Sequence, residues 1–430
     1  MRKSNKKHNF YKNNLCFEKY DTRCSVYDTR VYYMRAGGVL RGCARVALRV
    51  AIKKMYLYCM AMVTEVFTPA MFRAMAAKGY TQEDLCLRVG WSRRKIVDNF
   101  TMELAAAIEF LLDTPAKELW NFRKGELRAL QAGRREFNRM LCSREVIAWA
   151  RRFPVRELES RGLIASAAGM GAIGHNEASA TAAATAGQSH AQRYESGLVP
   201  REVMKFMGVA SIAGWQKAYA IAQDTLNPHA YSAWLRVGEL QVSRPPADFE
   251  IDRGCIARNL AFLRNNAVPY RAGLRRVFVE TLRKCDVAVL QVPAFLAAPA
   301  PRAACFWKGA RPVLQLPTGT ASDGDFMESA YGAMGHILYN RKRLSCLVTA
   351  DKVISSDPAR GVAAMRIAEN LLLTEAEECE IICCGRFEEP RCIEYFSRAF
   401  HVRPGIIVSR LQAQRKIPAI SPLNAFKIAV

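Results

Sequence analysis

The stretch Lys78-Gly-Tyr-Thr-Gln-Glu-Asp-Leu-Cys-Leu-Arg-Val-Gly-Trp-Ser-Arg-Arg-Lys-Ile96 predicts two short helices joined by a tight turn. Thr81 is a typical helix N-cap residue, and Asp84 stands three positions later, where a capping box places its partner. Gly90 suits the left-handed residue that ends a helix, and Ser92 suits the N-cap of the next helix. The buried faces are expected to carry Leu85, Cys86, Val89 and Ile96.

The second helix of this pair begins with the cations Arg93, Arg94 and Lys95. In a helix-turn-helix, the second helix presents its first turns to the major groove, where cations bind phosphates or guanine edges. The residues expected to contact DNA are Thr81, Gln82, Ser92, Arg93, Arg94 and Lys95. The alternative is a plain helical hairpin, because many hairpins also carry glycine at the turn.

The chain is strongly basic. Its 430 residues include 63 Lys and Arg against 39 Asp and Glu, which gives a formal net charge of +24. Such an excess favours polyanionic partners, nucleic acid first and anionic membrane second, although a basic soluble surface is an alternative. Half of the residues are hydrophobic, which argues against global disorder, and no run of 18 apolar residues predicts a membrane span.

The fourteen cysteines mostly stand singly, and no C-x-x-C pair occurs. Without a recognisable secretory signal, this usage predicts reduced thiols in a cytoplasmic protein. A zinc knuckle between Cys379 and Cys392 is the alternative, but the irregular spacing of the cysteines there disfavours it.

Composition divides the chain into four segments. Residues 1–66 are expected to form a basic tail and an amphipathic helix, or to be an extension of a protein whose translation starts at Met60 or Met62. Residues 67–150 are expected to form the helix-turn-helix domain, residues 151–198 an Ala/Gly-rich linker, and residues 199–430 a second domain. The cationic stripe of the first segment is formed by Arg41, Arg45, Arg49 and Lys53.

The second domain is expected to be mainly helical. Only residues 287–293 and 312–316 are short, apolar, β-branched runs bounded by turn residues, which is typical of strands. The predicted fold class is therefore mainly α with a small β element (α+β).

Residues 325–338 resemble the zinc helix of a metallopeptidase but lack the first zinc-binding histidine and the catalytic glutamate. Where H-E-x-x-H would stand, the chain has Gly332, Ala333, Met334, Gly335 and His336. The remnant His336 cannot hold Zn²⁺ alone, because zinc sites need three or four converging protein ligands. We therefore expect no bound metal, no other cofactor and no catalytic residue, with His336 a core or pocket histidine.

Taken together, the chain resembles XRE-type regulators that join a HigA-like helix-turn-helix to an ImmA/IrrE-type metallopeptidase domain. The resemblance implies a DNA-binding domain at residues 67–150 and a zincin-like domain at residues 199–430. In that family a glutamate on a later helix completes the zinc site, and Ala363 stands at the corresponding position here. The matching blocks are residues 78–85, 90–96, 113–120, 153–158, 206–210, 233–239, 335–338, 404–411 and 417–418.

Three functions compete at this point. The resemblance favours a sequence-specific DNA-binding regulator, antitoxin-like, whose inactive peptidase domain senses or binds a partner. An active zinc metallopeptidase that cleaves a repressor would need other ligands, such as Asp323 or Asp325, and a decayed homologue would have neither activity. For the regulator we expect double-stranded DNA, a second copy of the chain in a homodimer, and a toxin or repressor protein as partners, and no membrane.

Overall fold

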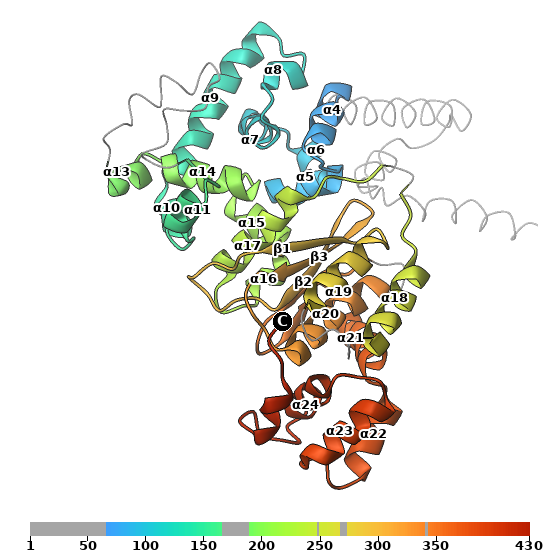
Figure 1. The fold of residues 1–430 in the computed structure, drawn as a ribbon. Coiled ribbons are helices and arrows are strands. Elements are labelled where there is room, and N and C mark those ends of the chain that lie inside the picture. Colours follow the sequence, from blue (N-terminus) through green and yellow to red (C-terminus); the bar gives the residue numbers. More distant parts are fainter. Residues whose placement is uncertain (1–65, 166–188, 247–248, 267–272, 340–342) are drawn as a thin grey trace, which may run out of the picture. The chain divides into compact units, whose positions relative to one another are not determined.

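A computed structural model of the protein describes residues 66–165, 189–246, 249–266, 273–339 and 343–430 (Figure 1). The chain divides into two compact units, Met1–Thr64 and Glu65–Val430. The tail and amphipathic helix expected over residues 1–66 lie outside the described residues, except for Val66. All helices and strands that the structure describes belong to the second unit.

The N-terminal part of this unit is a helical bundle in which α7 packs on α9. The amphipathic helix α9 buries Leu130, Phe137 and Leu141, which recur at helical spacing. A Cβ atom on Gly133 would lie 2.4 Å from the carbonyl oxygen of Met102, so this close crossing requires glycine. The bundle consists of α4 (Pro69–Ala77), α5 (Gln82–Val89), α6 (Arg93–Asp98), α7 (Met102–Leu112), α8 (Ala116–Leu119), α9 (Lys124–Leu141) and α10 (Arg144–Ala150).

The linker expected over residues 151–198 is wrong at both of its ends. Helix α11 (Val155–Ser160) buries Val155 and Leu158, and α13 (His190–Glu195) is tied to it by an ion pair of 2.7 Å between Arg193 and Glu159. Apolar residues among the polar ones at both ends join the main core, which outweighs the low complexity between them. Residues 166–188, most of the Ala-rich run, lie outside the described residues.

The helices that follow connect the bundle to a five-stranded sheet. They are α14 (Leu198–Met207), α15 (Ile212–Ala218), α16 (Ala220–Gln223), α17 (Pro228–Gln241), α18 (Arg253–Asn266) and α19 (Leu274–Arg283). The strands are β1 (Ala288–Val292), β2 (Ala303–Lys308), β3 (Arg311–Pro317), β4 (Cys346–Val348) and β5 (Val353–Ser355), in the order β1-β3-β2-β4-β5.

The sheet is mixed. Strand β1 runs parallel to β3, whereas the pairs β2–β3, β2–β4 and β4–β5 are antiparallel. The strands predicted at residues 287–293 and 312–316 are confirmed as β1 and β3. The other three were not predicted, because β4 and β5 have only three residues each and β2 is not rich in β-branched residues.

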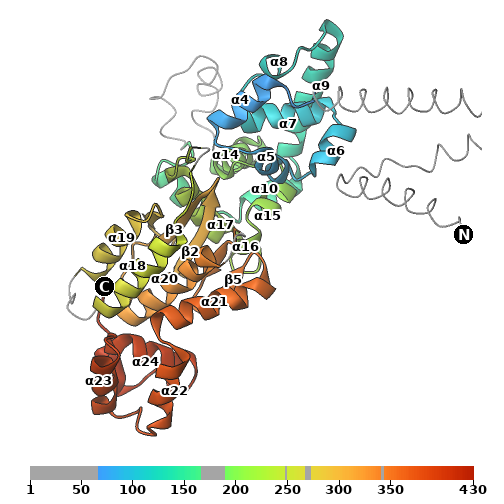
Figure 2. The same ribbon diagram turned by 90° about the vertical axis from the view of Figure 1, so that its right-hand side faces the viewer.

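Helices cover both faces of the sheet. Helices α19 and α20 (Asp323–Leu338) contact one face, while α16 and α17 contact the other (Figures 1 and 2). The alternation of side chains along β2 serves both layers, since Ala303 and Cys305 join the core with α20 and Ala304 joins the core with α17. Helix α21 (Pro358–Leu372) packs along α20.

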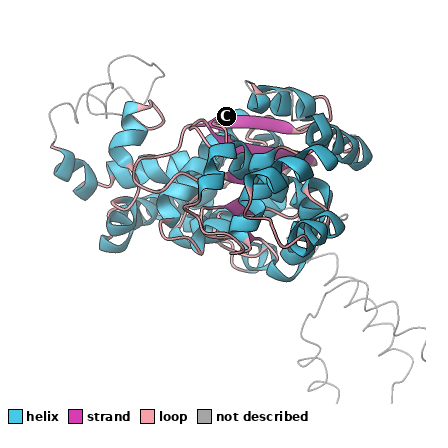
Figure 3. Ribbon diagram, turned by 60° about the horizontal axis from the view of Figure 1, so that its bottom comes forward, coloured by secondary structure: helices cyan, strands magenta, loops and turns pink. Residues whose placement is uncertain are grey.

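The C-terminal residues form a small helical cluster with its own apolar core. It consists of α22 (Glu375–Cys383), α23 (Pro390–Ala399), α24 (Pro404–Ala413) and a 3₁₀ helix at Pro422–Phe426. Helix α24 also crosses α20 closely, because a Cβ atom on Gly324 would lie 2.2 Å from the carbonyl oxygen of Gly405. Helices dominate and one small sheet lies among them (Figure 3), which confirms the expected mainly α class with a small β element.

Candidate nucleic-acid interface

The two-helix unit predicted from the sequence is present as α5 and α6. The Thr81 hydroxyl accepts a hydrogen bond from the Asp84 amide at 3.0 Å, and the Asp84 carboxylate accepts one from the Thr81 amide at 2.8 Å. This confirms the capping box. Gly90 ends α5 in the left-handed region with a φ of 89°, and Ser92 caps α6 through a 3.2 Å bond from the Lys95 amide.

The cations of α6 lie on the surface, and one apolar residue holds the helix in place. Ile96 is completely buried against the bundle, whereas Arg93, Arg94 and Lys95 are exposed. Lys95 Nζ lies 4.4 Å from the centre of the Trp91 ring, and Arg94 Nε lies 3.2 Å from a carboxylate oxygen of Asp98 on the same helix. Lys95, Arg94 and Asp98 are exposed and Trp91 is half-buried, so these contacts cost little to break.

Of the other residues expected to contact DNA, Thr81 and Gln82 are less exposed than the α6 cations, whereas Ser92 is exposed like them. Thr81 is half-buried, and its hydroxyl also donates to the Asp84 carboxylate at 2.8 Å, so it both accepts and donates within the cap. Gln82 is half-buried at the start of α5, and Ser92 is exposed at the start of α6. The hydrogen bonds of Thr81 therefore show that it caps α5.

The C-terminal end of α5 is docked on the segment that leads into α15. The last carbonyl oxygens of a helix have no partner within it. Here the Ala210 amide donates to the Arg88 carbonyl at 3.0 Å, the Ser211 hydroxyl donates to the Val89 carbonyl at 2.9 Å, and Lys217 Nζ donates to the Gly90 carbonyl at 2.6 Å.

A glycine in α15 permits this docking. A Cβ atom on Gly214 would lie 2.1 Å from the carbonyl oxygen of Arg88, which no side chain could tolerate without a shift of the backbone. The helix pair is thus held at a defined place on the rest of the folded unit, and α6 follows directly after the docked end.

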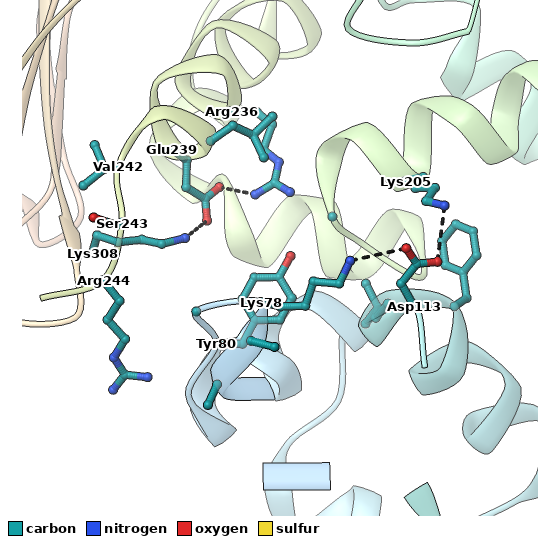
Figure 4. A pocket seen from close by; sticks show the side chains of 17 residues that line it. Lys78, Tyr80, Asp113, Lys205, Arg236, Glu239, Val242, Ser243, Arg244 and Lys308 are labelled. Atoms are coloured by element: carbon teal, nitrogen blue, oxygen red, sulfur yellow. Dashed lines mark hydrogen bonds and ion pairs between the residues drawn. The ribbon is translucent and has the colours of Figure 1, made fainter. Parts of the chain in front are cut away.

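A buried cluster of charges also connects α5 to the rest of the folded unit, through α14 and α17. The Arg88 guanidinium donates to the carbonyl oxygens of Met207 (3.2 Å) and Gly208 (3.1 Å) at the end of α14, and it pairs with the carboxylate of Glu239 on α17. Glu239 also pairs with Arg236 at 2.9 Å and with Lys308, the last residue of β2, at 3.7 Å (Figure 4).

Burial raises the pKa of Glu239, but the charges of Arg88 and Arg236 outweigh it and hold that pKa well below the ordinary value for glutamate. The carboxylate is therefore ionised in the folded protein. This cluster was not predicted from the sequence. The available signal was Arg88 itself, a cation one turn from Leu85 on the buried face of a short helix, where a charged side chain needs a partner.

His336 lies in the last turn of α20 and is completely buried. Its Nδ1 atom lies 2.9 Å from the carbonyl oxygen of Gly332. Gly335 has a packing role, since a Cβ atom there would lie 2.3 Å from the carbonyl oxygen of Ala364 on α21. Ala363, which the resemblance puts at the third ligand position, is half-buried on the same helix. The helix that resembles a zinc helix is thus packed tightly on α21.

The carboxylates considered for an active peptidase lie at the other end of α20. Asp323 is completely buried and pairs with Arg403 at 2.8 Å, and it accepts hydrogen bonds from the amides of Gly324 and Ile428. Asp325 accepts a 2.7 Å bond from the Ser322 hydroxyl. At ~1.5 Å per residue, these positions are roughly 16–20 Å along the helix from His336. They cannot act together with it.

Two further observations on the described residues concern metal binding and membrane crossing. Within the described ranges, no group of three or more His, Cys, Asp or Glu side chains could hold a metal ion. Across the same ranges, no helix combines the length and apolar character that crossing a bilayer requires. Comparisons of this chain with protein-family models, with curated proteins and with solved structures gave no match.

Proposed function

We propose that this protein is a sequence-specific DNA-binding transcriptional regulator of the XRE type, antitoxin-like, that acts in the cytoplasm. The observation that carries the proposal is the presentation of α6. Its cations Arg93, Arg94 and Lys95 are exposed on a helix that is anchored by the buried Ile96 and follows the capped, docked helix α5.

The contacts of the α6 side chains in the free protein suit an exchange of partners. The Arg94–Asp98 pair is exposed on both sides, with side-chain exposures of 70% and 55%, and such pairs contribute only ~0–1 kcal/mol. A DNA phosphate or a guanine edge offers the guanidinium a stronger, bidentate partner. The net charge of +24 adds attraction that does not depend on sequence.

We further propose that the domain at residues 199–430 is an ImmA/IrrE-like domain with a degenerate zinc motif, which binds a toxin or repressor protein instead of cleaving it. Support comes from α20, where His336 is the remaining side chain of the motif and Gly335 serves the crossing with α21. Helix-turn-helix readers usually bind two-fold sites as dimers, so we propose a homodimer.

The proposal is tested by selecting bound sequences from a random DNA pool at two salt concentrations. We expect a two-fold symmetric motif to be enriched, and specific binding to be lost in the double variant Arg93→Ala/Arg94→Ala, at ~1–3 kcal/mol per base contact. The control Arg391→Ala/Arg398→Ala removes the same charge from exposed positions of α23 and should keep the motif.

Two outcomes would refute the recognition role of α6. One is a selection that enriches no motif at either salt concentration. The other is an Arg93→Ala/Arg94→Ala variant that binds the selected DNA as tightly as the unaltered protein. Equal losses in the two double variants would show that only net charge matters.

A further inference from the structure

A cationic pocket lies beside the buried charge cluster. It has a volume of about 540 Å³ and is lined by residues from five places in the chain. The turn at 78–80 before α5 forms one wall, α17 and the residues after it form another, and Lys205 and Lys308 reach in from α14 and β2 (Figure 4). Residues beside the helix-turn-helix and a residue of the sheet therefore line the same pocket.

Cations outnumber carboxylates in the lining. The five cations are Lys78, Lys205, Arg236, Arg244 and Lys308, and the two carboxylates are Asp113 and Glu239, so the lining carries 5 − 2 = +3 formal charges. Asp113 is shared by Lys78 at 3.5 Å and Lys205 at 3.3 Å. Each carboxylate thus serves more than one cation, and positive charge is left over.

Lys78, Lys205 and Arg244 are exposed, but the side chains of the other two cations of the lining are largely buried. The side chains of Arg236 and Lys308 are only 7% and 13% exposed, although charged side chains are seldom buried without full pairing. Lys308 lies 3.7 Å from Glu239, a carboxylate already paired with Arg88 and Arg236. The exposed Arg244 has no hydrogen bond or ion pair within the part of the chain that the structure describes.

The same pocket has an apolar part. Phe110 and Leu111 line it from α7, and Leu240 and Val242 line it from the end of α17. Leu240 is 53% exposed, which leaves apolar surface available beside the cations. A ligand that satisfies both parts carries several negative charges and an organic ring or chain.

We propose that this pocket binds a nucleotide-sized organic polyphosphate. In this arrangement the phosphates interact with Lys308 and Arg244, and the organic moiety lies against the apolar part. A ligand at this place also contacts the turn at 78–80, which leads directly into α5. Its binding is therefore coupled to the position of the helix-turn-helix, and this second step rests on the proposed DNA-binding function.

The pocket is tested without DNA by titrating the full chain calorimetrically with ATP, pyrophosphate and adenosine. We expect saturable binding of one ATP per chain, weaker binding of pyrophosphate, and the weakest binding of adenosine. Arg244→Ala and Lys308→Ala should each lower the affinity for ATP about tenfold or more, because each removes a charged hydrogen-bond donor. The exposed Arg398→Ala on α23 is the matched control and should bind as the unaltered protein does.

Several results would overturn the proposal that this pocket binds an organic polyphosphate. These are the absence of ATP binding at millimolar concentration, unchanged affinity in Arg244→Ala, or an equal loss in Arg398→Ala, which would indicate attraction by net charge alone. Arg244 is exposed, so its replacement leaves the fold intact, and circular dichroism melting verifies this for both pocket variants. Pyrophosphate that binds as tightly as ATP would remove the role of the apolar part and overturn the proposal of an organic ligand.

A second measurement separates the pocket from the proposed function. Binding of the selected DNA is titrated with and without saturating ATP, in the unaltered protein and in Arg244→Ala. We expect ATP to change the DNA affinity at least threefold in the unaltered protein and not in the variant. ATP binding without this change overturns the coupling alone, whereas a protein that binds ATP but no DNA overturns the proposed function and leaves the pocket standing.

Discussion

Replacing Glu239 by Gln is expected to destabilise the protein strongly. The carboxylate pairs with Arg88, Arg236 and Lys308, whose side chains are only 8%, 7% and 13% exposed. Glutamine keeps the shape of the side chain but removes the charge, so three buried cations would face one another without a counter-ion. The connection between α5, α17 and β2 would lose the group that holds it together.

The size of the effect follows from the burial of these groups. Removing one partner of a buried ion pair costs ~3–5 kcal/mol, because the remaining charge has lost its partner but not regained its water. That is a large share of the ~5–15 kcal/mol by which a typical domain is stable. Arg88→Met removes one of the cations, so Arg88→Met/Glu239→Gln should cost ~0.5–3 kcal/mol less than the sum of the single variants.

The measurement is urea unfolding at pH 7, followed by circular dichroism and by the fluorescence of buried residues such as Trp215 and Trp234. Glu388→Gln, an exposed position after α22, is the matched control and should stay within ~0.5 kcal/mol of the unaltered protein. A cost below ~1 kcal/mol for Glu239→Gln, or full additivity with Arg88→Met, would refute the reasoning.

The same substitution predicts a pH dependence. The folded protein holds the pKa of Glu239 far below the value of ~4.3 for an unfolded glutamate. The contribution of this group is therefore complete above that unfolded value, and it is lost as the pH falls towards the folded pKa. The difference in unfolding free energy between the unaltered protein and Glu239→Gln should shrink between pH 5 and pH 3. An unchanged difference at pH 3 would contradict the ionised carboxylate.

Three further predictions concern other parts of the chain. Gly214→Ala should destabilise by ~1–3 kcal/mol in thermal unfolding, because its methyl group would meet the Arg88 carbonyl, whereas Gly125→Ala in an open position of α9 should be neutral or stabilising. Deleting residues 1–60 should lower the slope of log affinity for DNA against log salt and leave the selected motif unchanged; an altered motif would give that segment a role in recognition. Elemental analysis should find well under one equivalent of zinc, and His336→Ala should cost ~1–3 kcal/mol of stability without affecting DNA binding; stoichiometric zinc that this variant loses would restore the peptidase hypothesis.

Local features of the fold were readable from the sequence. The sequence predicted the Thr81 cap, the left-handed Gly90 and the Ser92 cap. Each depends on hydrogen bonds or backbone angles within a few residues, so the residue types are sufficient to predict it. Strands β1 and β3 were predicted for a similar reason, since short apolar runs rich in β-branched residues are typical of strands. The exposure of the α6 cations was predicted from residue type, since Ile96 is the apolar residue that α6 buries.

Tertiary structure alone decided the features that join distant residues. Arg88 and Glu239 are 151 positions apart, and the pocket combines the turn at 78–80 with Arg244 and Lys308. The strands β4 and β5 are three residues long and exist because the neighbouring strand supplies their hydrogen bonds. Residue types and spacing reveal bonds that close within a helical turn, whereas contacts across a hundred residues depend on how packed layers bring the chain together.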